Sequence, residues 1–163
     1  MTMIFLDASA LAKAYLDEEG TSSVLGVMER RKESLYLSEF VALEVLTSIR
    51  IRLRDASAEK YEASVKRFRS DYATRFTLLR GSREISESAL ELTTRKRSAR
   101  ARSMDVLHVA TALRLQRDFE SFGGAVVMVT SDRDLAALAE ECGLRTFDPS
   151  REPLAALPRA RRG

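Results

Sequence analysis

The stretch that decides the fold is Ala125-Val126-Val127-Met128-Val129-Thr130-Ser131-Asp132. Its first five residues are all apolar, and three of them are β-branched valines, which predicts a strand buried on both faces. A second run of this kind, Met3-Ile4-Phe5-Leu6, is followed at once by Asp7. Strands of this type belong to parallel sheets that are covered by helices, so the sequence indicates an α/β fold.

The rest of the chain alternates between short strand-like runs and helical patterns. Strands are expected at 3–6, 34–37, 76–79, 125–130 and 144–147. Helices are expected at 8–16, from 21 or 22 to about 31, from 38 or 39 through 49, at 56–72, from 82 to about 92, at 104–119 and at 132–142. Thr21 or Ser22, Ser82 and Ser103 are the expected caps of the helices that they precede. We therefore expect a single α/β domain with a five-stranded parallel sheet and helices on both faces.

Composition narrows the class of protein. With 163 residues and 45% hydrophobic side chains, the chain is one ordinary globular domain. We expect this domain to span 1–148, followed by a tail at 149–163 that carries prolines and arginines and stays outside the core. A single cysteine and a single histidine exclude an internal disulfide and a zinc site of the usual kind. No apolar run reaches the length of a membrane span, so a cytoplasmic location without membrane association is expected.

Two acidic residues stand directly after expected strands. Asp7 follows the first strand and Asp132 follows the fourth. Ligands of open α/β sheets bind beyond the carboxyl ends of the strands, so neighbouring strands would bring these two carboxylates into one crevice. Helix capping is the alternative for each, because Asp7 precedes one helix and Asp132 begins another.

Two further acids interrupt apolar helical segments. Glu44 lies within Phe40-Val41-Ala42-Leu43-Glu44-Val45-Leu46, where a buried carboxylate would need a cation, a hydrogen bond or a raised pKa. A structural salt bridge to an arginine is the alternative for Glu44. Asp105 lies near the start of the helix Met104 to Phe119, where interaction with the helix dipole is the alternative.

Taken together, the four acids predict a metal site. Carboxylates that share a crevice repel one another unless a cation compensates, and all-oxygen ligands favour Mg²⁺ or Mn²⁺. Such ions promote phosphodiester hydrolysis by polarising a phosphoryl oxygen and lowering the pKa of bound water. The spacing of the four residues is loose, so the spacing alone does not establish the site.

Four motifs, in this order, resemble those of the PIN-domain family, and specifically VapC-type toxin ribonucleases of type II toxin–antitoxin systems. The motifs are Ile4-Phe5-Leu6-Asp7-Ala8-Ser9-Ala10-Leu11-Ala12-Lys13, Leu37-Ser38-Glu39-Phe40-Val41-Ala42-Leu43-Glu44, Asp105-Val106-Leu107-His108-Val109-Ala110-Thr111-Ala112, and Val129-Thr130-Ser131-Asp132-Arg133-Asp134-Leu135. The resemblance extends from residue 3 to about 148. It implies a five-stranded parallel sheet, a Mg²⁺- or Mn²⁺-dependent endoribonuclease, a homodimer and a cognate antitoxin that blocks the site.

The resemblance also assigns roles to individual residues. Asp7, Glu44, Asp105 and Asp132 would form the catalytic acidic quartet and its metal site. Asp7 and Asp105 would bind the metal directly, Asp132 would bind it through water or hold a second ion, and Glu44 would orient the attacking water. The hydroxyl groups of Ser9, Thr130 and Ser131 would support these carboxylates, with helix capping as the alternative. His108 lies on about the same helix face as Asp105, and we interpret it as a packed or supporting residue, not a general base.

A basic segment precedes the Asp105 helix. It contains Arg95, Lys96, Arg97, Arg100 and Arg102. These side chains are candidates to bind an RNA backbone and bring it to the metal site, with a solvated charged face as the alternative. No aromatic residue is interleaved with them, so no base recognition is expected from this segment. The RNA itself, whether tRNA, rRNA or mRNA, is not determined by the sequence.

The alternative to an enzyme is a non-catalytic PIN-like module that binds RNA or protein. Such a module would be expected to lack one or more of the four acids, and all four are present. A phospho-acceptor domain would need adjacent acids after the first strand, but Ala8 follows Asp7. A toprim-like nuclease would carry a glutamate where Asp7 stands.

Overall fold

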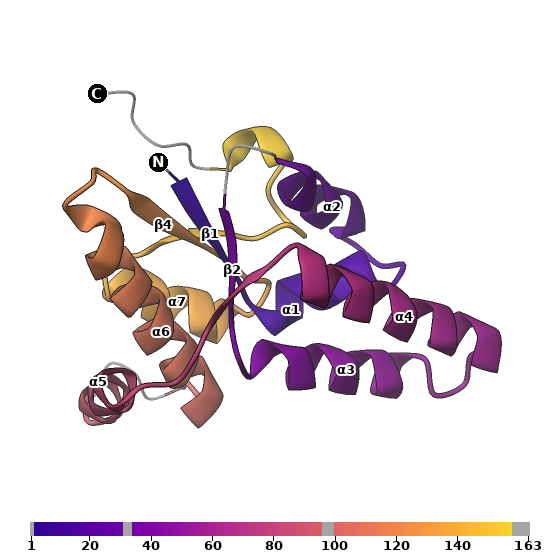
Figure 1. Cartoon of the computed structure of the whole chain (residues 1–163), viewed down its shortest axis with the longest axis horizontal. Coiled ribbons are helices and arrows are strands. Elements are labelled where there is room, and N and C mark those ends of the chain that lie inside the picture. Colours follow the sequence, from indigo (N-terminus) through magenta and orange to yellow (C-terminus); the bar gives the residue numbers. More distant parts are fainter. Residues whose placement is uncertain (1, 31–33, 96–99, 158–163) are drawn as a thin grey trace.

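The computed structural model describes residues 2–30, 34–95 and 100–157. Five strands form one parallel sheet in the order β3-β2-β1-β4-β5 (Figure 1). The strands are β1 (Thr2–Leu6), β2 (Ser34–Ser38), β3 (Thr77–Leu79), β4 (Ala125–Val129) and β5 (Arg145–Phe147). The predicted α/β fold with a five-stranded parallel sheet is therefore confirmed.

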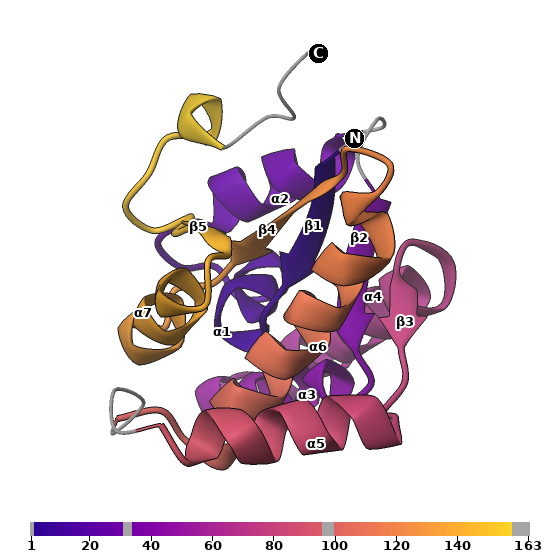
Figure 2. The same ribbon diagram turned by 90° about the vertical axis from the view of Figure 1, so that its left-hand side faces the viewer.

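Helices cover both faces of this sheet (Figure 2). The first face carries α1 (Ala8–Leu11), the 3-10 helix η1 (Ala12–Ala14), α2 (Thr21–Glu29), α3 (Val41–Arg52) and α4 (Ala58–Thr74). The second face carries α5 (Arg83–Thr93), α6 (Ser103–Glu120) and α7 (Arg133–Glu141). A second 3-10 helix, η3 (Leu154–Ala156), follows the last strand. None of the helices in the described residues has the length and apolar character needed to cross a membrane.

The central strand β1 separates two hydrophobic clusters. Ile4 and Leu6 pack with the helices of the first face, whereas Met3 and Phe5 pack with those of the second. All four side chains are fully buried. Successive side chains of a strand point to opposite faces, so a continuously apolar run is what a strand between two helical layers requires.

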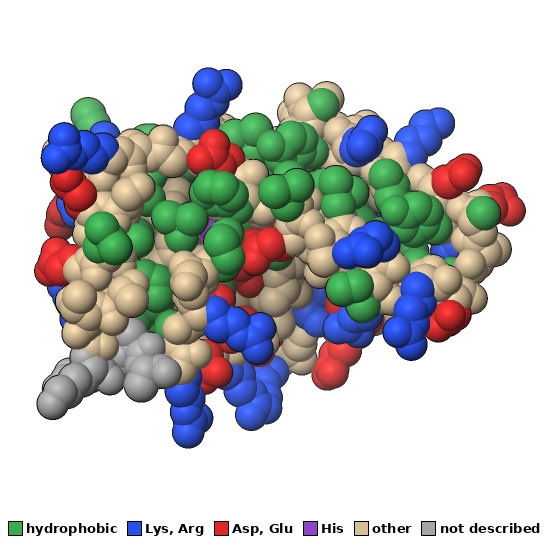
Figure 3. All heavy atoms as spheres, turned by 90° about the horizontal axis from the view of Figure 1, so that it is seen from below, with side chains coloured by type: hydrophobic (Ala, Val, Ile, Leu, Met, Phe, Trp, Pro, Cys, Tyr) green, Lys and Arg blue, Asp and Glu red, His purple; other side chains and the backbone are tan. Residues whose placement is uncertain are grey.

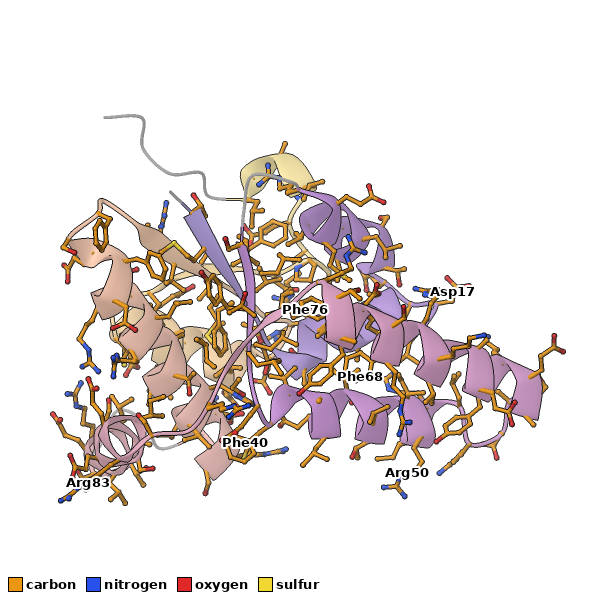
Figure 4. The ribbon with its side chains drawn as sticks, viewed as in Figure 1. Asp17, Phe40, Arg50, Phe68, Phe76 and Arg83 are labelled. Atoms are coloured by element: carbon orange, nitrogen blue, oxygen red, sulfur yellow. The ribbon has the colours of Figure 1, made fainter. Side chains whose placement is uncertain are left out.

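The helices α3 and α4 extend beyond the sheet as an antiparallel pair (Figure 1). The ring of Phe68, directed inward from α4 in Figure 4, lies 5.2 Å from the ring of Tyr15. The Tyr15 hydroxyl donates a 3.0 Å hydrogen bond to Asp71, and the Ser64 hydroxyl donates one to the Tyr15 carbonyl. Burial, followed by the charge of Asp71, raises the pKa of Tyr15 far above its usual range. These contacts attach α4 to the segment that follows the first strand.

Two predicted helix caps are wrong. Gly20 precedes α2 with φ 91°, and the Thr21 hydroxyl instead accepts from the Glu18 N–H and contacts preceding carbonyls. Arg102, not Ser103, is the residue before α6, and its backbone N–H donates to Asp105. The residue before α2 has a left-handed backbone, which favours glycine, so Gly20 occupies the cap position and Thr21 is the first residue of the helix. The predicted cap Ser82 is confirmed, since its hydroxyl accepts from the Ile85 N–H.

The tail packs on the domain as far as it is described. Leu157 is 1% exposed and belongs to the core of the first face, so the expectation that the tail stays outside the core is wrong for this residue. Leu154 lies against Gly26 of α2, where an added Cβ would collide with the leucine side chain. The absence of a side chain at Gly26 thus leaves space for the tail to dock.

Candidate metal site at the strand ends

Three adjacent strands end in polar side chains on the same edge of the sheet. Asp7 follows β1, Ser38 is the last residue of β2, and Thr130 follows β4. Because β1 lies between β2 and β4, the three side chains meet at the point where the chain order reverses. All three are buried, and Asp7 is 4% exposed.

Hydrogen bonds fix the Asp7 carboxylate through one of its oxygens. Oδ2 accepts from the backbone N–H of Ser9 at 3.0 Å, from the Ser9 hydroxyl at 2.6 Å and from the Thr130 hydroxyl at 3.1 Å. The Ser9 hydroxyl also accepts from the backbone N–H of Ser131 at 2.9 Å. Asp7 therefore caps α1, as the alternative interpretation held, while its Oδ1 faces the site, 3.9 Å from Nε2 of His108.

Glu44 is held by His108. Oε2 of Glu44 lies 2.6 Å from Nε2 of the imidazole, whose Nδ1 lies 2.9 Å from the hydroxyl of Ser38. The Glu44 side chain is 35% exposed and that of His108 is 1% exposed. The expected burial of Glu44 is thus only partial, and its ion-pair partner is a histidine instead of the arginine considered from the sequence.

The charges around His108 outweigh the effect of its burial. Burial alone lowers the pKa of a histidine, but the hydrogen bond with Glu44 and the charges of Asp7, Glu44 and Asp105 raise it. The net pKa of His108 lies above its usual range. The surrounding carboxylates therefore favour the protonated form of the imidazole.

Asp105 and Asp132 both make the helix-capping contacts that the alternative interpretation described. Oδ2 of Asp105 accepts from the Arg102 N–H at 2.7 Å. Oδ1 of Asp132 accepts from the N–H groups of Asp134 and Leu135 at the start of α7. Within the described residues, each of these hydrogen-bond sets uses one carboxylate oxygen, so capping leaves the second oxygen of each group for a ligand.

The electrostatics place Asp105 among the other acids. Burial raises the pKa of Asp105, the Arg102 N–H opposes this, and the charges of Asp132 and Asp7 raise it further. In the described part of the chain, the ion pairs of Asp7 and Glu44 involve only His108. Among the described residues, the site therefore gathers carboxylates around one histidine.

The donor groups fit a divalent cation. One ligand atom each from Asp7, Glu44 and His108 lie within 4.8 Å of one another. The carboxylate oxygens of Asp7 and Glu44 are hard donors of the kind that Mg²⁺ and Mn²⁺ prefer, whereas both nitrogens of His108 already have hydrogen-bond partners. The structure brings Glu44 and Asp7 together through His108, and the metal ligands among the four acids remain a prediction.

A hollow of about 250 Å³ adjoins the carboxylates on the side of α7 and β5. It shares Thr130 and Asp132 with the site. The exposed residues Arg133 and Arg151 line it together with the acids Glu140, Asp148 and Glu152, and Arg151 is paired with Asp148. Asp148, which lines the hollow, accepts a 2.9 Å hydrogen bond from the Ser131 hydroxyl. A polynucleotide that reaches the carboxylates thus has room to continue beyond them.

The basic segment is described only in part. Lys96 and Arg97 lie outside the described residues. Arg95 is exposed and forms an ion pair with Glu91 of α5 at 2.9 Å. Arg100 and Arg102 are exposed at the start of α6, three to five residues before Asp105 along the chain. RNA binding by this segment stays a prediction.

Sequence reasoning missed two of the contacts that organise the site. Ser38 was considered only as the start of a helix, and His108 was not paired with Glu44. Ser38 could have been found because it ends a strand beside the Asp7 strand, at the same edge of a parallel sheet. The pairing of His108 with Glu44 joins α6 to α3 across the end of the sheet, and no local pattern reports it.

Comparisons with known proteins agree with this arrangement. The family model of the PIN domain matches residues 4–141, so the chain belongs to the PIN domain family. No curated protein matches it in sequence. The resemblance found in the motifs is therefore confirmed at the level of the family.

Several solved structures have this fold. FitAcB from Neisseria gonorrhoeae matches with a TM-score of 0.66 and 14% identity, over 92% of this chain and 100% of that chain. VapBC2 from Rickettsia felis, bound to a DNA fragment from its promoter, matches with a TM-score of 0.62 and 14% identity, over 90% and 98%. VapC20 from Mycobacterium tuberculosis, a sarcin-ricin-loop-cleaving toxin, matches with a TM-score of 0.58 and 16% identity, over 82% and 93%. At these identities the similarity establishes the fold.

Proposed function

We propose that this protein is a metal-dependent endoribonuclease that hydrolyses RNA phosphodiester bonds, and that it is the toxin of a VapBC-type pair. The observation that carries the proposal is the cluster of Asp7, Glu44 and His108 at the strand ends. Asp105 and Asp132 are outside this set, but the charges of Asp132 and Asp7 both raise the pKa of Asp105. The neighbours VapBC2 and VapC20 support the toxin assignment, since the latter is described as an RNA-cleaving toxin.

The four acids have separate roles in this proposal. Asp7 and Asp105 would hold a Mg²⁺ or Mn²⁺ ion directly, and Asp132 would contribute through water or hold a second ion. When bound, such an ion polarises a phosphoryl oxygen and lowers the pKa of water. Glu44 would orient the attacking water through Oε1, because Oε2 is held by His108. The hydroxyls of Ser9 and Thr130 hold Asp7 in place. Ser131 contributes its backbone N–H, which donates to Ser9, whereas its hydroxyl donates to Asp148.

Two pairs of exposed arginines are the candidates to contact the substrate backbone. Arg100 and Arg102 precede the Asp105 helix, and Arg133 and Arg151 line the hollow beside Asp132. Arginine is suited to phosphate because its planar fork forms bidentate contacts. We propose that the RNA backbone contacts these two groups on either side of the cleaved bond, whereas a cognate antitoxin covers the same site in the inhibited state.

A homodimer is part of the same proposal. Leu43 and Ile51 of α3 and Leu90 of α5 are 67%, 54% and 68% exposed. Figure 3 shows apolar side chains gathered on the face of the molecule on which these helices lie. Exposed apolar surface of this kind favours association, and Leu43 directly precedes Glu44. Two copies that meet through this face would therefore place their sites near one another.

The test is RNA cleavage by the wild type and by Asp7→Asn. The wild type should cleave structured RNA, such as tRNA or rRNA, in the presence of Mg²⁺ or Mn²⁺ and not after chelation. Asp7→Asn should lose cleavage by at least about 100-fold while unfolding at nearly the wild-type temperature. A fully active Asp7→Asn protein would overturn the assignment.

Asp17→Asn is the matched control. Asp17 is exposed and lies at the far end of the molecule from α5 (Figure 4). The same chemical change there should leave cleavage unchanged. RNA sequencing after induced expression would then identify the target RNA.

A further inference from the structure

The buried imidazole of His108 connects two helices and a strand at the site. Its ring lies on α6, Nε2 contacts Glu44 of α3 at 2.6 Å, and Nδ1 contacts Ser38 at the end of β2 at 2.9 Å. The ring is 1% exposed and packs against Phe5, with ring centroids 6.5 Å apart. Each ring nitrogen therefore has one hydrogen-bond partner, and the ring cannot turn without losing both hydrogen bonds.

The chemistry of the two contacts determines where one proton lies. A carboxylate accepts hydrogen bonds and cannot donate them, so the proton between His108 and Glu44 is carried by Nε2. Nδ1 is then free either to accept from the Ser38 hydroxyl or to donate to it. With a proton on Nε2, His108 acts as a donor toward Glu44, and its Nε2 lone pair is not available as a metal ligand or a base.

The contact fixes one Glu44 oxygen and leaves the other for the site. A glutamate side chain that is 35% exposed would otherwise sample several rotamers. Holding Oε2 against a buried ring restricts this freedom, and Oε1 is not used by the contact with His108. Positions that support metal or catalytic ligands in this way are commonly as important as the ligands themselves.

We propose that Ser38 and His108 form a positioning pair that orients Glu44 through the Nε2–H of the imidazole. The inference rests on the proposed function for its catalytic consequence, because Glu44 is the residue that would orient the attacking water. Ser38 sets the rotation of the ring, the ring sets the direction of Nε2–H, and Nε2–H sets the position of the Glu44 carboxylate.

Two amide substitutions distinguish the contact of His108 with Glu44 from its contact with Ser38. The amide nitrogen of glutamine reaches about the position of Nε2, whereas that of asparagine reaches about the position of Nδ1. His108→Gln should therefore keep the donor to Glu44, and His108→Asn should keep only the contact with Ser38. We expect His108→Asn to lower kcat by about 10- to 100-fold with little change in KM, and His108→Gln to stay within a few-fold of the wild type.

Metal binding gives a readout that does not depend on cleavage. A Glu44 oxygen also lies in the candidate ion cluster, so its carboxylate adds negative charge beside the ion. Titration of Mn²⁺ by calorimetry should therefore show weaker binding to His108→Asn and nearly unchanged binding to His108→Gln. Ser38→Ala should give an intermediate loss, since the ring remains but one hydrogen bond is gone. Equal losses in the glutamine and asparagine variants would overturn the proposal, because a purely structural role does not distinguish the two nitrogens.

Nuclear magnetic resonance tests the proton position directly in the wild type. The chain has one histidine, so the imidazole nitrogen signals need no assignment by mutation. The metal-free protein should show a protonated Nε2 whose proton signal shifts in Glu44→Gln. An unprotonated Nε2 would overturn the proposal even if the variants at His108 failed to fold.

The outcomes also separate this inference from the proposed function. If the wild type cleaves no RNA, but Nε2 is protonated and Mn²⁺ affinity falls only in His108→Asn, the positioning role stands and the ribonuclease assignment fails. If the wild type cleaves RNA and His108→Asn cleaves it at the wild-type kcat, the ribonuclease assignment stands and the positioning role fails.

Discussion

The hydroxyl groups of Ser9 and Thr130 lie 3.1 Å apart, although 121 positions separate the two residues in the sequence. Both hydroxyls also contact Oδ2 of Asp7. Ser9 lies in α1, directly after β1, and Thr130 follows β4, so the contact joins the ends of the two central strands. The Asp7 carboxylate is consequently positioned by groups from two distant parts of the chain.

The first prediction concerns this contact. Thr130→Val keeps the shape of the side chain but removes the donor to Asp7 and the acceptor of the Asp132 N–H. We expect the free energy of unfolding to fall by about 1–3 kcal/mol, because buried polar groups lose a partner. Urea denaturation measures this change.

Thr111→Val is the control for that measurement. Thr111 is also buried, but its hydroxyl donates only to the Leu107 carbonyl of its own helix. Its substitution should cost less than about 1 kcal/mol, since that carbonyl remains within the helix. Equal losses at the two positions would show that Thr130 has no special role at the strand ends.

The second prediction concerns divalent cations. Mn²⁺ or Mg²⁺ at millimolar concentration should raise the melting temperature, because the ion binds only the folded state. Asp7→Asn should abolish the increase. Glu87→Gln is the control, since Glu87 is an exposed acid of α5 paired with Arg83, and it should keep the full increase. Absence of any shift in the wild type would contradict a carboxylate metal site.

The third prediction concerns RNA binding by the start of α6. Replacing Arg100 and Arg102 with alanine should weaken binding several-fold at moderate salt. The slope of log affinity against log salt should fall by about 0.7–0.9 for each arginine removed. The Arg102 N–H that caps Asp105 belongs to the backbone and is retained in the alanine variant.

Arg83→Ala provides the comparison for RNA binding. Arg83 is exposed at the start of α5 and is already paired with Glu87 (Figure 4). Filter binding or fluorescence anisotropy at several salt concentrations gives the slopes. If the three alanine substitutions have the same effect, the arginines beside α6 form only a solvated face.

The fourth prediction concerns the pH dependence of stability. The pKa of Tyr15 is raised by burial and by the charge of Asp71, whereas in the unfolded chain it is about 10. Above pH of about 10, the unfolded state therefore holds fewer protons than the folded state, and the contribution of Tyr15 to stability falls as pH rises. This contribution is fully present below that pH.

Comparison of the wild type with Tyr15→Phe isolates the effect. Tyr15→Phe loses the hydrogen bond to Asp71 and should be less stable at neutral pH by about 1 kcal/mol. The difference should shrink between about pH 9 and pH 11. A difference that stays constant over this range, measured by urea denaturation, would show that Tyr15 ionises equally in both states.

The fifth prediction concerns self-association. Leu43→Glu and Leu90→Glu together should convert a dimer to a monomer in sedimentation experiments, because charges would enter the apolar surface of α3 and α5. Phe122→Glu is the control. Phe122 is 79% exposed in the turn after α6, at the end of that helix away from α3 and α5 (Figure 1). A wild type that is monomeric at micromolar concentration would contradict the dimer.

Much of the fold could be predicted from the sequence because the signals are local. The five strand-like runs correspond to five strands, and the apolar runs at Met3–Leu6 and Ala125–Val129 are the neighbouring strands β1 and β4. The errors lie at helix ends, where Gly20 and Arg102 replace the predicted caps. Caps depend on backbone conformation at a single residue, which a pattern of apolar residues does not report.

Local sequence patterns predicted only part of the site. Asp7 and Asp132 could be placed at one edge because each follows a strand, and strand direction is common to the whole parallel sheet. The capping contacts of Asp105 and Asp132 were open alternatives, and the structure shows that capping uses one oxygen of each. Capping and metal binding are therefore compatible for the same carboxylate.

The sequence by itself determined the layered α/β architecture, the family motifs and the acids at the strand ends, because hydrophobic periodicity and position after a strand are local properties. Only the tertiary structure decided that Glu44 faces His108, that Ser38 holds the imidazole, and that Leu157 of the tail enters the core. These contacts join residues on different elements across the fold, so their geometry exists only after the sheet and its helices have packed.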